Sequence, residues 1–392
     1  MHVSVRLARL GGEPNPLAAA RSDLLARGVA LTELTDTNPT NHGLLDERVL
    51  EILARATRRA GRYDPDPRGW LGAREALAGR FGGEPDDYWL TASTSQAYGW
   101  LFTLLTDPGQ AVATPTPGYP LIEPLARLAD ARVADYRTHY LHPTGWEYDL
   151  DTVRAALARP QTRALVVVNP GNPTGAYTEG ATAAALGEAC AARGLPLLAD
   201  EVFWPFVLEA APPPAGPPGR LADAVGTTTV FTLDGLSKLL CAPQVKLGWI
   251  RASGPGHERW APHLDRIADA YLGVGSPVAL ALPELLELAD DAIARVRARL
   301  SGNLATLRAV FGDGGYRVRT AHGGWMALLD VPPVLDDSAL ALHLLSTAHL
   351  SVHPGWFYDL DSPAPLALSL LPSPTAFAAG GAALRRAVDA LA

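Results

Sequence analysis

The chain has 392 residues, of which 48% are hydrophobic and 19% charged, and its formal net charge is −8. This length favours two packed domains, and the acidic balance argues against nucleic acid as the main partner. No apolar stretch is long enough to cross a membrane, and the N-terminal residues lack the apolar core of a signal peptide, so we expect a cytoplasmic protein without a membrane partner. Two cysteines are too few for a disulfide framework, and no Cys/His cluster has the spacing of a metal site, so no metal is expected.

The middle of the chain alternates short apolar runs with helical patterns, which is typical of a parallel or mixed α/β sheet. The predicted strands are Tyr88–Thr91, Ala111–Thr114, Arg132–Tyr136, Arg163–Val168, Leu195–Ala199, Val230–Leu233 and Leu247–Arg251. The predicted helices between them are Gln96–Leu105, Leu121–Ala129, Leu150–Ala158 and Thr178–Arg193. Ligands of such sheets bind at the carboxyl ends of the strands, so we expect the functional loops there.

The pattern changes near Pro277. Leu282–Phe311 has the period of one long helix, and Gly314–Val331 and Leu366–Leu371 resemble strands with helices after them. We therefore expect a large domain over 41–276, a smaller α+β domain over 277–392, and an N-terminal segment, 1–40, that packs with the small domain. The proline-rich stretch Ala210–Gly219 is expected to form a surface loop.

Three loops that follow predicted strands carry polar side chains. Asn169–Gly175 (NPGNPTG) has two prolines and two glycines, which indicates a rigid turn that can aim an Asn amide at a ligand. Asp200 directly follows another strand and could hold a protonated ring nitrogen, although a lone Asp at a strand end more often caps a turn. The hydroxyls of 91–96 suit a phosphate at a helix N-terminus, or they form an ordinary helix cap.

Only two of the 33 Lys and Arg residues are lysines, Lys238 and Lys246. Arginine cannot lose its proton in a protein, whereas a desolvated lysine can, and only an amine condenses with a carbonyl. The apolar run Thr228–Leu233 leads to a turn at Gly235 that presents Lys238. This arrangement favours a Schiff-base lysine at 238, and the alternative is chance in an arginine-rich composition.

The order and spacing of NPGNPTG, DEVF (200–203) and SKLLCAPQVKLGW (237–249) resemble the class I/II aminotransferases, the aspartate-aminotransferase-like enzymes of fold type I. The segments 36–40, 63–65, 74–76, 118–120 and 323–325 also look like this family, so the resemblance covers nearly the whole chain. It implies an α/β fold, in which a large domain with a mixed, mostly parallel seven-stranded sheet is joined to a smaller α+β domain. It also implies pyridoxal 5'-phosphate (PLP) as cofactor, an amino acid and a 2-oxo acid as substrates, and a homodimer.

The resemblance also implies roles for individual residues. Lys238 would form the Schiff base and move the substrate's proton, Asp200 would pair with the ring nitrogen, and Asn172 would bind the phenolic oxygen. Tyr119 would stack on the ring. The phosphate would be held by Ser93, Thr94, Ser95, Ser237 and Lys246 and, from a second subunit, by Tyr63. Asn38 and Asn172 would line the substrate side.

The chain departs from the family's pattern at three cofactor or substrate positions. Phe203 stands where a tyrosine usually donates to the phenolic oxygen, and Lys246 replaces the phosphate-binding arginine. Ala367 stands where an arginine usually clamps the substrate carboxylate, which leaves cofactor binding intact but opens the question of the substrate. Trp70, Trp204, Trp325 and Trp356 could line an apolar pocket or belong to the core.

The expected function is that of a PLP-dependent aminotransferase. Because Ala367 stands where the arginine usually lies, a PLP-dependent C–S β-lyase or cyclase on the same scaffold is the alternative. A regulatory module that only senses a ligand through PLP would need a DNA-binding partner domain, for which this sequence offers no segment.

Overall fold

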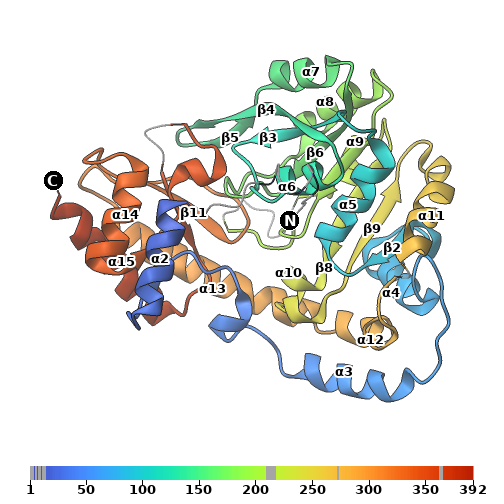
Figure 1. Ribbon diagram of the computed structural model, residues 1–392, viewed down its shortest axis with the longest axis horizontal. Helices are drawn as coiled ribbons and strands as arrows, with labels where there is room; N and C mark the ends of the chain where they lie inside the picture. The colour runs from blue at the N-terminus through green and yellow to red at the C-terminus, as the bar shows by residue number, and fades with distance from the viewer. Residues whose placement is uncertain are drawn as a thin grey trace.

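The computed structural model describes residues 4, 7, 10, 15–208, 218–271, 273–361 and 365–391. Most of the proline-rich stretch expected to form a surface loop lies outside the described residues, and so do most of the first 14 residues. The larger part of the molecule is a sheet covered by helices on both faces, and a long helix, α13, connects it to a smaller unit (Figure 1). This architecture confirms the α/β fold class.

The large sheet has eight strands in the order β2-β9-β8-β7-β6-β3-β4-β5. Their bounds are β2 Tyr88–Thr91, β3 Ala111–Thr116, β4 Arg132–Leu141, β5 Gly145–Tyr148, β6 Thr162–Val168, β7 Leu197–Asp200, β8 Val230–Gly235 and β9 Gly248–Ser253. Strands β4, β3, β6, β7 and β8 pair in parallel, whereas β9 is antiparallel to both β8 and β2. All seven predicted strands are therefore present.

The prediction of seven strands was nevertheless one short, because β5 forms an antiparallel hairpin with β4. Only Gly145 of its four residues is buried, and Glu147 is exposed, so the segment carries no apolar run that marks a strand in the sequence. Gly145 begins β5 with a φ of +116°, and a Cβ there would lie 2.9 Å from the ring of His322. The turn therefore requires glycine.

Helices bury both faces of the sheet. On one face, α5 (Thr94–Leu105), α6 (Ile122–Leu128) and α11 (Ala261–Tyr271) share one apolar cluster with Phe231 and Ile250 of the sheet. On the other face lie α7 (Leu150–Ala158), α8 (Gly180–Ala191) and α9 (Leu221–Val225). Helix α7 shows how the sequence specifies these elements: Asp149 accepts hydrogen bonds from two backbone N–H groups of the first turn, and Val153, Ala156 and Leu157 form the buried stripe.

Next to β2, three helices form a separate layer: α3 (Arg48–Arg59), α4 (Leu71–Phe81) and α12 (Ser276–Leu286). The prediction of one helix over Leu282–Phe311 was wrong, because α12 ends at Leu286 and α13 (Ala289–Val310) begins three residues later. Leu285, Leu286, Leu288 and Ala289 continue the apolar period of a helix across this boundary and hide it. Asp290 and Asp291, acidic residues in the first turn of α13, are the signal that marks it.

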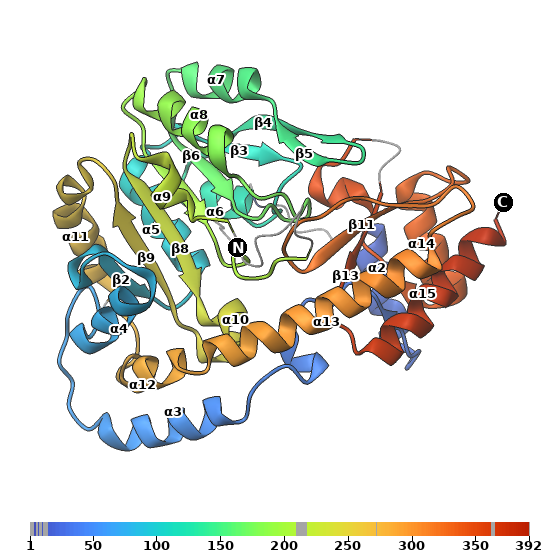
Figure 2. The same cartoon turned by 180° about the vertical axis from the view of Figure 1, so that it is seen from behind.

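The smaller unit combines a three-stranded antiparallel sheet with helices. The sheet order is β10 (Arg317–Val318), β11 (Met326–Asp330) and β13 (Leu366–Ser369), and the helices are α14 (Asp337–Ala348) and α15 (Pro374–Asp389). The N-terminal helix α2 (Pro16–Ala26) packs on α14, and β1 (Thr32–Glu33) pairs in parallel with β12 (Leu350–Ser351). Figure 2 shows α13 running from beside α10 to this unit. No helix of the described chain is both long and apolar enough to cross a membrane.

Candidate active site

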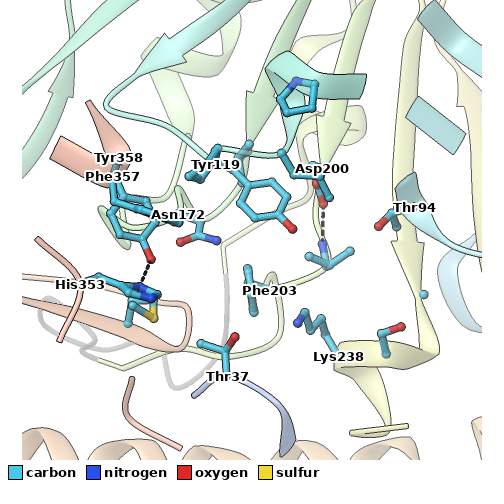
Figure 3. A pocket seen from close by; sticks show the side chains of 18 of the residues that line it. Thr37, Thr94, Tyr119, Asn172, Asp200, Phe203, Lys238, His353, Phe357 and Tyr358 are labelled. Carbon is cyan, nitrogen blue, oxygen red and sulfur yellow. Dashed lines mark hydrogen bonds between the residues drawn. The ribbon is translucent and has the colours of Figure 1, made fainter. Parts of the chain in front are cut away.

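A cavity of about 410 Å³ lies where β6, β7 and β8 end, and it faces the smaller unit. Val168, Asp200 and Gly235, the last residues of these three strands, all line it. The predicted site residues that line it are Thr94, Tyr119, Asn172, Asp200, Phe203, Ser237 and Lys238 (Figure 3). The structure therefore brings together residues that lie up to 144 positions apart, since 238 − 94 = 144.

Asp200 is buried at the end of β7. The hydroxyl of Tyr98 donates to its Oδ2 at 2.9 Å, and the backbone N–H of Val202 donates to its Oδ1 at 3.4 Å. Burial raises the pKa of Asp200 to about 6, although both hydrogen bonds act in the opposite direction. A buried carboxylate of this kind is stabilised by a cation, such as a protonated ring nitrogen. Sequence reasoning missed Tyr98, which lies one turn into the helix that follows the predicted phosphate loop.

Lys238 belongs to the short helix α10 (Leu236–Leu239), directly after β8. Its Nζ lies 4.9 Å from the centroid of the Trp325 ring and 5.4 Å from that of Phe203. Burial lowers the pKa of Lys238, and the charge of Asp200 acts against this effect. The lowered pKa favours the neutral amine, which is the nucleophilic form that attacks a carbonyl.

Asn172 lies in a loop that is fixed at both ends. Asn169 donates from Nδ2 to Oε1 of Glu201 at 2.9 Å and accepts a hydrogen bond from the backbone N–H of Thr178 at 2.9 Å. The Oδ1 atom of Asn172 is buried and has no hydrogen-bond partner in the described part of the chain. An unpartnered buried amide at a cavity wall indicates that a ligand or water completes its hydrogen bonds.

The N-terminus of α5 supplies an anion site. Ser93 is the N-cap and accepts a hydrogen bond from the backbone N–H of Gln96 at 3.2 Å, and Thr94 lines the cavity. The first N–H groups of a helix have no partner inside the helix, so they are available to a phosphate. A Cβ at Gly248 would lie 3.1 Å from the backbone nitrogen of Thr94. Glycine at position 248 therefore lets β9 lie close to this cradle. Ser95 is partly buried but is not among the residues that line the cavity.

Besides Ser93 and Ser95, three predicted residues do not line the cavity. Lys246 is exposed, with a φ of +56°, at the end of the 3-10 helix η3 (Pro243–Val245). Tyr63 has 68% of its surface exposed. Asn38 is exposed, and its side chain accepts a hydrogen bond from the backbone N–H of Thr40, while the neighbouring Thr37 lines the cavity. The roles of Lys246, Tyr63 and Asn38 therefore stay predictions.

A buried ionic network lies behind the site. Arg220 places Nη1 3.2 Å from Oε2 of Glu201 and Nη2 3.0 Å from Oδ2 of Asp234, and its guanidinium lies 4.3 Å from the centroid of the Trp204 ring. Glu201 adjoins Asp200, and Asp234 lies at the end of the strand that precedes Lys238. The network therefore fixes the ends of β7 and β8, which carry the two central groups of the site. Arg220 was not predicted, because its neighbours in the sequence give no motif.

The four tryptophans considered for the pocket do not line the cavity, although Trp325 packs against Lys238. Trp204 donates from its indole to the backbone carbonyl of Pro218 at 2.9 Å. Trp204 therefore cannot supply the donor that a tyrosine in place of Phe203 would provide. Trp70 and Trp356 are both about two fifths exposed.

The substrate side of the cavity has an aromatic and apolar wall from the smaller unit: Met326, His353, Phe357 and Tyr358. Ala367 is fully buried in β13, and no arginine of the described chain lines the cavity. His353, Phe357 and Tyr358 were missed because the HPGWFY segment has no recognisable motif, and only the small-unit fold brings it to the site. No group of three or more His, Cys, Asp or Glu side chains in the described chain is placed to hold a metal ion.

A family model described as "Aminotransferase class I and II" matches residues 36–368. The chain therefore belongs to this family, and the resemblance inferred from its motifs is confirmed. Enzymes of this family use PLP. Lys238 and Asp200 in one cavity, the Asn172 amide on its wall and the anion cradle at Thr94 fit that cofactor.

Individual relatives differ in what their names say they act on. The "Probable aminotransferase TAT2" of Arabidopsis thaliana is 31% identical over 53% of this chain and 49% of its own length. The aspartate/prephenate aminotransferase of Thermus thermophilus is 27% identical over 85% of both chains. The alignments span about half or less of the first curated relatives, between 36% and 49% of their lengths. In fold, the alanine aminotransferase of Pyrococcus furiosus is similar with a TM-score of 0.89 at 20% identity, over 99% of this chain and 100% of that one.

Proposed function

We propose that the protein is a PLP-dependent aminotransferase that exchanges an amino group between an amino acid and a 2-oxo acid. The observation that carries this proposal is the placement of the Lys238 amine and the Asp200 carboxylate in one cavity, with the pKa of each shifted by burial. When bound, PLP supplies an electron sink for the bonds at the substrate's α-carbon.

The chain's own residues would divide the remaining work. Asp200 would hold the ring nitrogen protonated, with Tyr98 fixing the orientation of the carboxylate. Thr94 and Ser237 would hold the phosphate, with Ser93, Ser95 and Lys246 as further predicted contacts, and Asn172 would donate to the phenolic oxygen. Tyr119 would cover one face of the ring. Lys238 would bind the cofactor covalently and, once released by the substrate, its neutral amine would move the proton at the α-carbon.

The test is a half-reaction of the purified holoenzyme with a panel of amino acids and no 2-oxo acid. We expect the pyridoxal form to convert to the pyridoxamine form, with release of one equivalent of 2-oxo acid, and a second substrate should reverse the change. The alternative, a C–S β-lyase or cyclase, is favoured by Ala367 in place of the clamping arginine. Continuous release of pyruvate and ammonia from a sulfur amino acid, without the pyridoxamine form, would decide for the lyase.

We also propose a homodimer in which Tyr63 of one subunit reaches the phosphate of the other. Tyr63, between α3 and α4, and Tyr271, at the end of α11, are 68% and 62% exposed. The exposure of these two large side chains supports a surface that contacts a partner subunit there. Sedimentation of the holoenzyme at micromolar concentration should give the mass of two chains, and a monomer would contradict the proposal. Both cysteines are free, which supports a reducing, cytoplasmic location.

The domain division expected from the sequence, 41–276 against 277–392 with 1–40, is likewise a proposal. The pairing of β1 with β12 and the packing of α2 on α14 support the assignment of 1–40 to the small unit. The packing of α12 on α3 and α4 favours a boundary between Leu286 and Ala289.

A further inference from the structure

Ala367 and His353 lie directly opposite each other in the smaller unit. The backbone N–H of Ala367 donates to the carbonyl of His353 at 2.8 Å, and the N–H of His353 donates back to the carbonyl of Ala367 at 3.3 Å. Residues paired in this way in an antiparallel bridge direct their side chains to the same face. The space that a long side chain at 367 would enter is therefore next to the imidazole of His353, which lines the cavity.

The imidazole of His353 is oriented by a hydrogen bond at Nδ1 and by stacking on one ring face. Its Nδ1 lies 3.0 Å from the hydroxyl of Tyr358, and its ring stacks on Phe357 with centroids 4.9 Å apart and planes at 16°. Burial raises the pKa of Tyr358, so the phenol keeps its proton and can donate to Nδ1. The proton of a neutral imidazole then resides on Nε2. No described residue makes a hydrogen bond to Nε2, and the ring lines the cavity below Tyr358 (Figure 3).

We propose that His353, oriented by Tyr358, binds the substrate carboxylate in place of an arginine at 367. The proposal rests on the proposed function and narrows its substrate class to amino acids with one carboxylate and an apolar side chain. Met326, Phe357 and Leu121 supply the apolar wall, and no arginine of the described chain reaches the cavity to bind a second carboxylate. Tyr358 acts here as a positioning residue, since it contacts His353 and fixes which nitrogen carries the proton.

The protonation of His353 should tune this binding. Burial lowers the pKa of His353, and from neighbouring elements the charge of Glu33 acts to raise it and that of Arg21 to lower it. The neutral ring donates one hydrogen bond, and the charged ring adds an ionic attraction to a carboxylate. Carboxylate affinity should therefore increase as the pH falls through the pKa of His353, and an uncharged probe should lack this increase.

The test compares two unreactive probes, 3-phenylpropanoate and 3-phenylpropanamide, which differ only in charge at the end that His353 would bind. Their binding to the holoenzyme is measured by calorimetry. The wild type should bind the acid at least about tenfold more tightly, which is the size expected of a hydrogen bond to a charged group. In His353→Phe, which retains the stacking on Phe357, the acid and amide should bind within about twofold of each other, and the pH dependence should disappear.

The matched control is His139→Phe, the same exchange on β4, where the side chain is 52% exposed and does not line the cavity. This variant should keep the wild-type preference for the acid. His353→Gln, which keeps an N–H donor, should recover part of the preference. An unchanged preference in His353→Phe, or no preference in the wild type, would overturn the proposal.

If His353→Phe yields too little folded holoenzyme, Tyr358→Phe provides the test. The ratio of the affinities for the acid and the amide must fall severalfold in this variant, because the donor to Nδ1 is lost. An unchanged ratio in that variant overturns the proposal as well. Failure of the proposed function gives a different result, since the half-reaction with amino acids would then fail in the wild type while the probes still report the anion site.

Discussion

The buried carboxyl group of Asp200 should destabilise the protein when no cofactor is bound. Its pKa is about 6 in the fold and 3.8 in an exposed reference state. One pKa unit corresponds to about 1.4 kcal/mol, so ionised Asp200 costs roughly 3 kcal/mol of the free energy of unfolding. Because the folded state holds the proton more tightly than the unfolded state, this penalty is absent below pH 3.8, develops between pH 3.8 and about 6, and is complete above.

The variant Asp200→Asn isolates this effect, because it keeps an acceptor for Tyr98 but cannot ionise. We expect the free energy of unfolding of the cofactor-free variant, minus that of the cofactor-free wild type, to increase by about 2.4 kcal/mol from pH 4 to pH 7. Urea unfolding followed by tryptophan fluorescence measures it, and the titration of all other groups cancels in the difference. Tyr98→Phe removes a hydrogen bond that lowers the pKa of Asp200, so the pKa in this variant should be higher. The free energy of unfolding of the variant should therefore still decrease with pH above pH 6.

The reasoning would be refuted by a difference between Asp200→Asn and wild type that does not change with pH. The same substitution should weaken cofactor binding and abolish turnover, because the ring nitrogen loses its counter-charge. A gain in the stability of the cofactor-free protein together with a loss of function would show that the buried carboxylate is kept for the cofactor.

Four further predictions concern single positions. Lys238→Arg should lose the yellow colour of the holoenzyme and several orders of magnitude of turnover despite its charge, and substantial activity would refute the Schiff-base assignment. Phe203→Tyr should lower the pH at which the yellow colour fades, because a phenol stabilises the cofactor's oxygen anion; a spectrophotometric titration without a shift would contradict this. Arg220→Met should destabilise the protein by about 3–5 kcal/mol in urea unfolding, since Glu201 and Asp234 lose their buried partner, and a loss below about 1 kcal/mol would show that the network is unimportant. In steady-state kinetics, glutamate should have a higher KM than phenylalanine, and a low-micromolar KM for glutamate would mean that an arginine reaches the site.

Local sequence patterns were enough to predict the class of the protein and the centre of its site. Asp200 ends a strand, and Asn172 and Lys238 each follow one. These strands are short apolar runs bounded by turn residues, so the local pattern was enough to predict them. The motifs that follow the strands are local too. The scarcity of lysine and the glycine turn before Lys238 also indicated a reactive amine without any tertiary information. These features are readable because each depends on residues within one strand and its following loop.

Tertiary structure decided everything that depends on long-range packing. Tyr98 becomes the partner of Asp200 only because α5 packs on one face of the sheet with Tyr98 beside the end of β7, and Arg220 joins Glu201 and Asp234 across two strands. The break between α12 and α13 falls where α12 ends its packing on α3 and α4, although the apolar period of a helix continues across it. His353 can take the place of an arginine at 367 only because the small sheet pairs these two residues across 14 positions, since 367 − 353 = 14. The sequence shows that the arginine is missing, whereas only the fold shows which side chain stands beside the space it would fill.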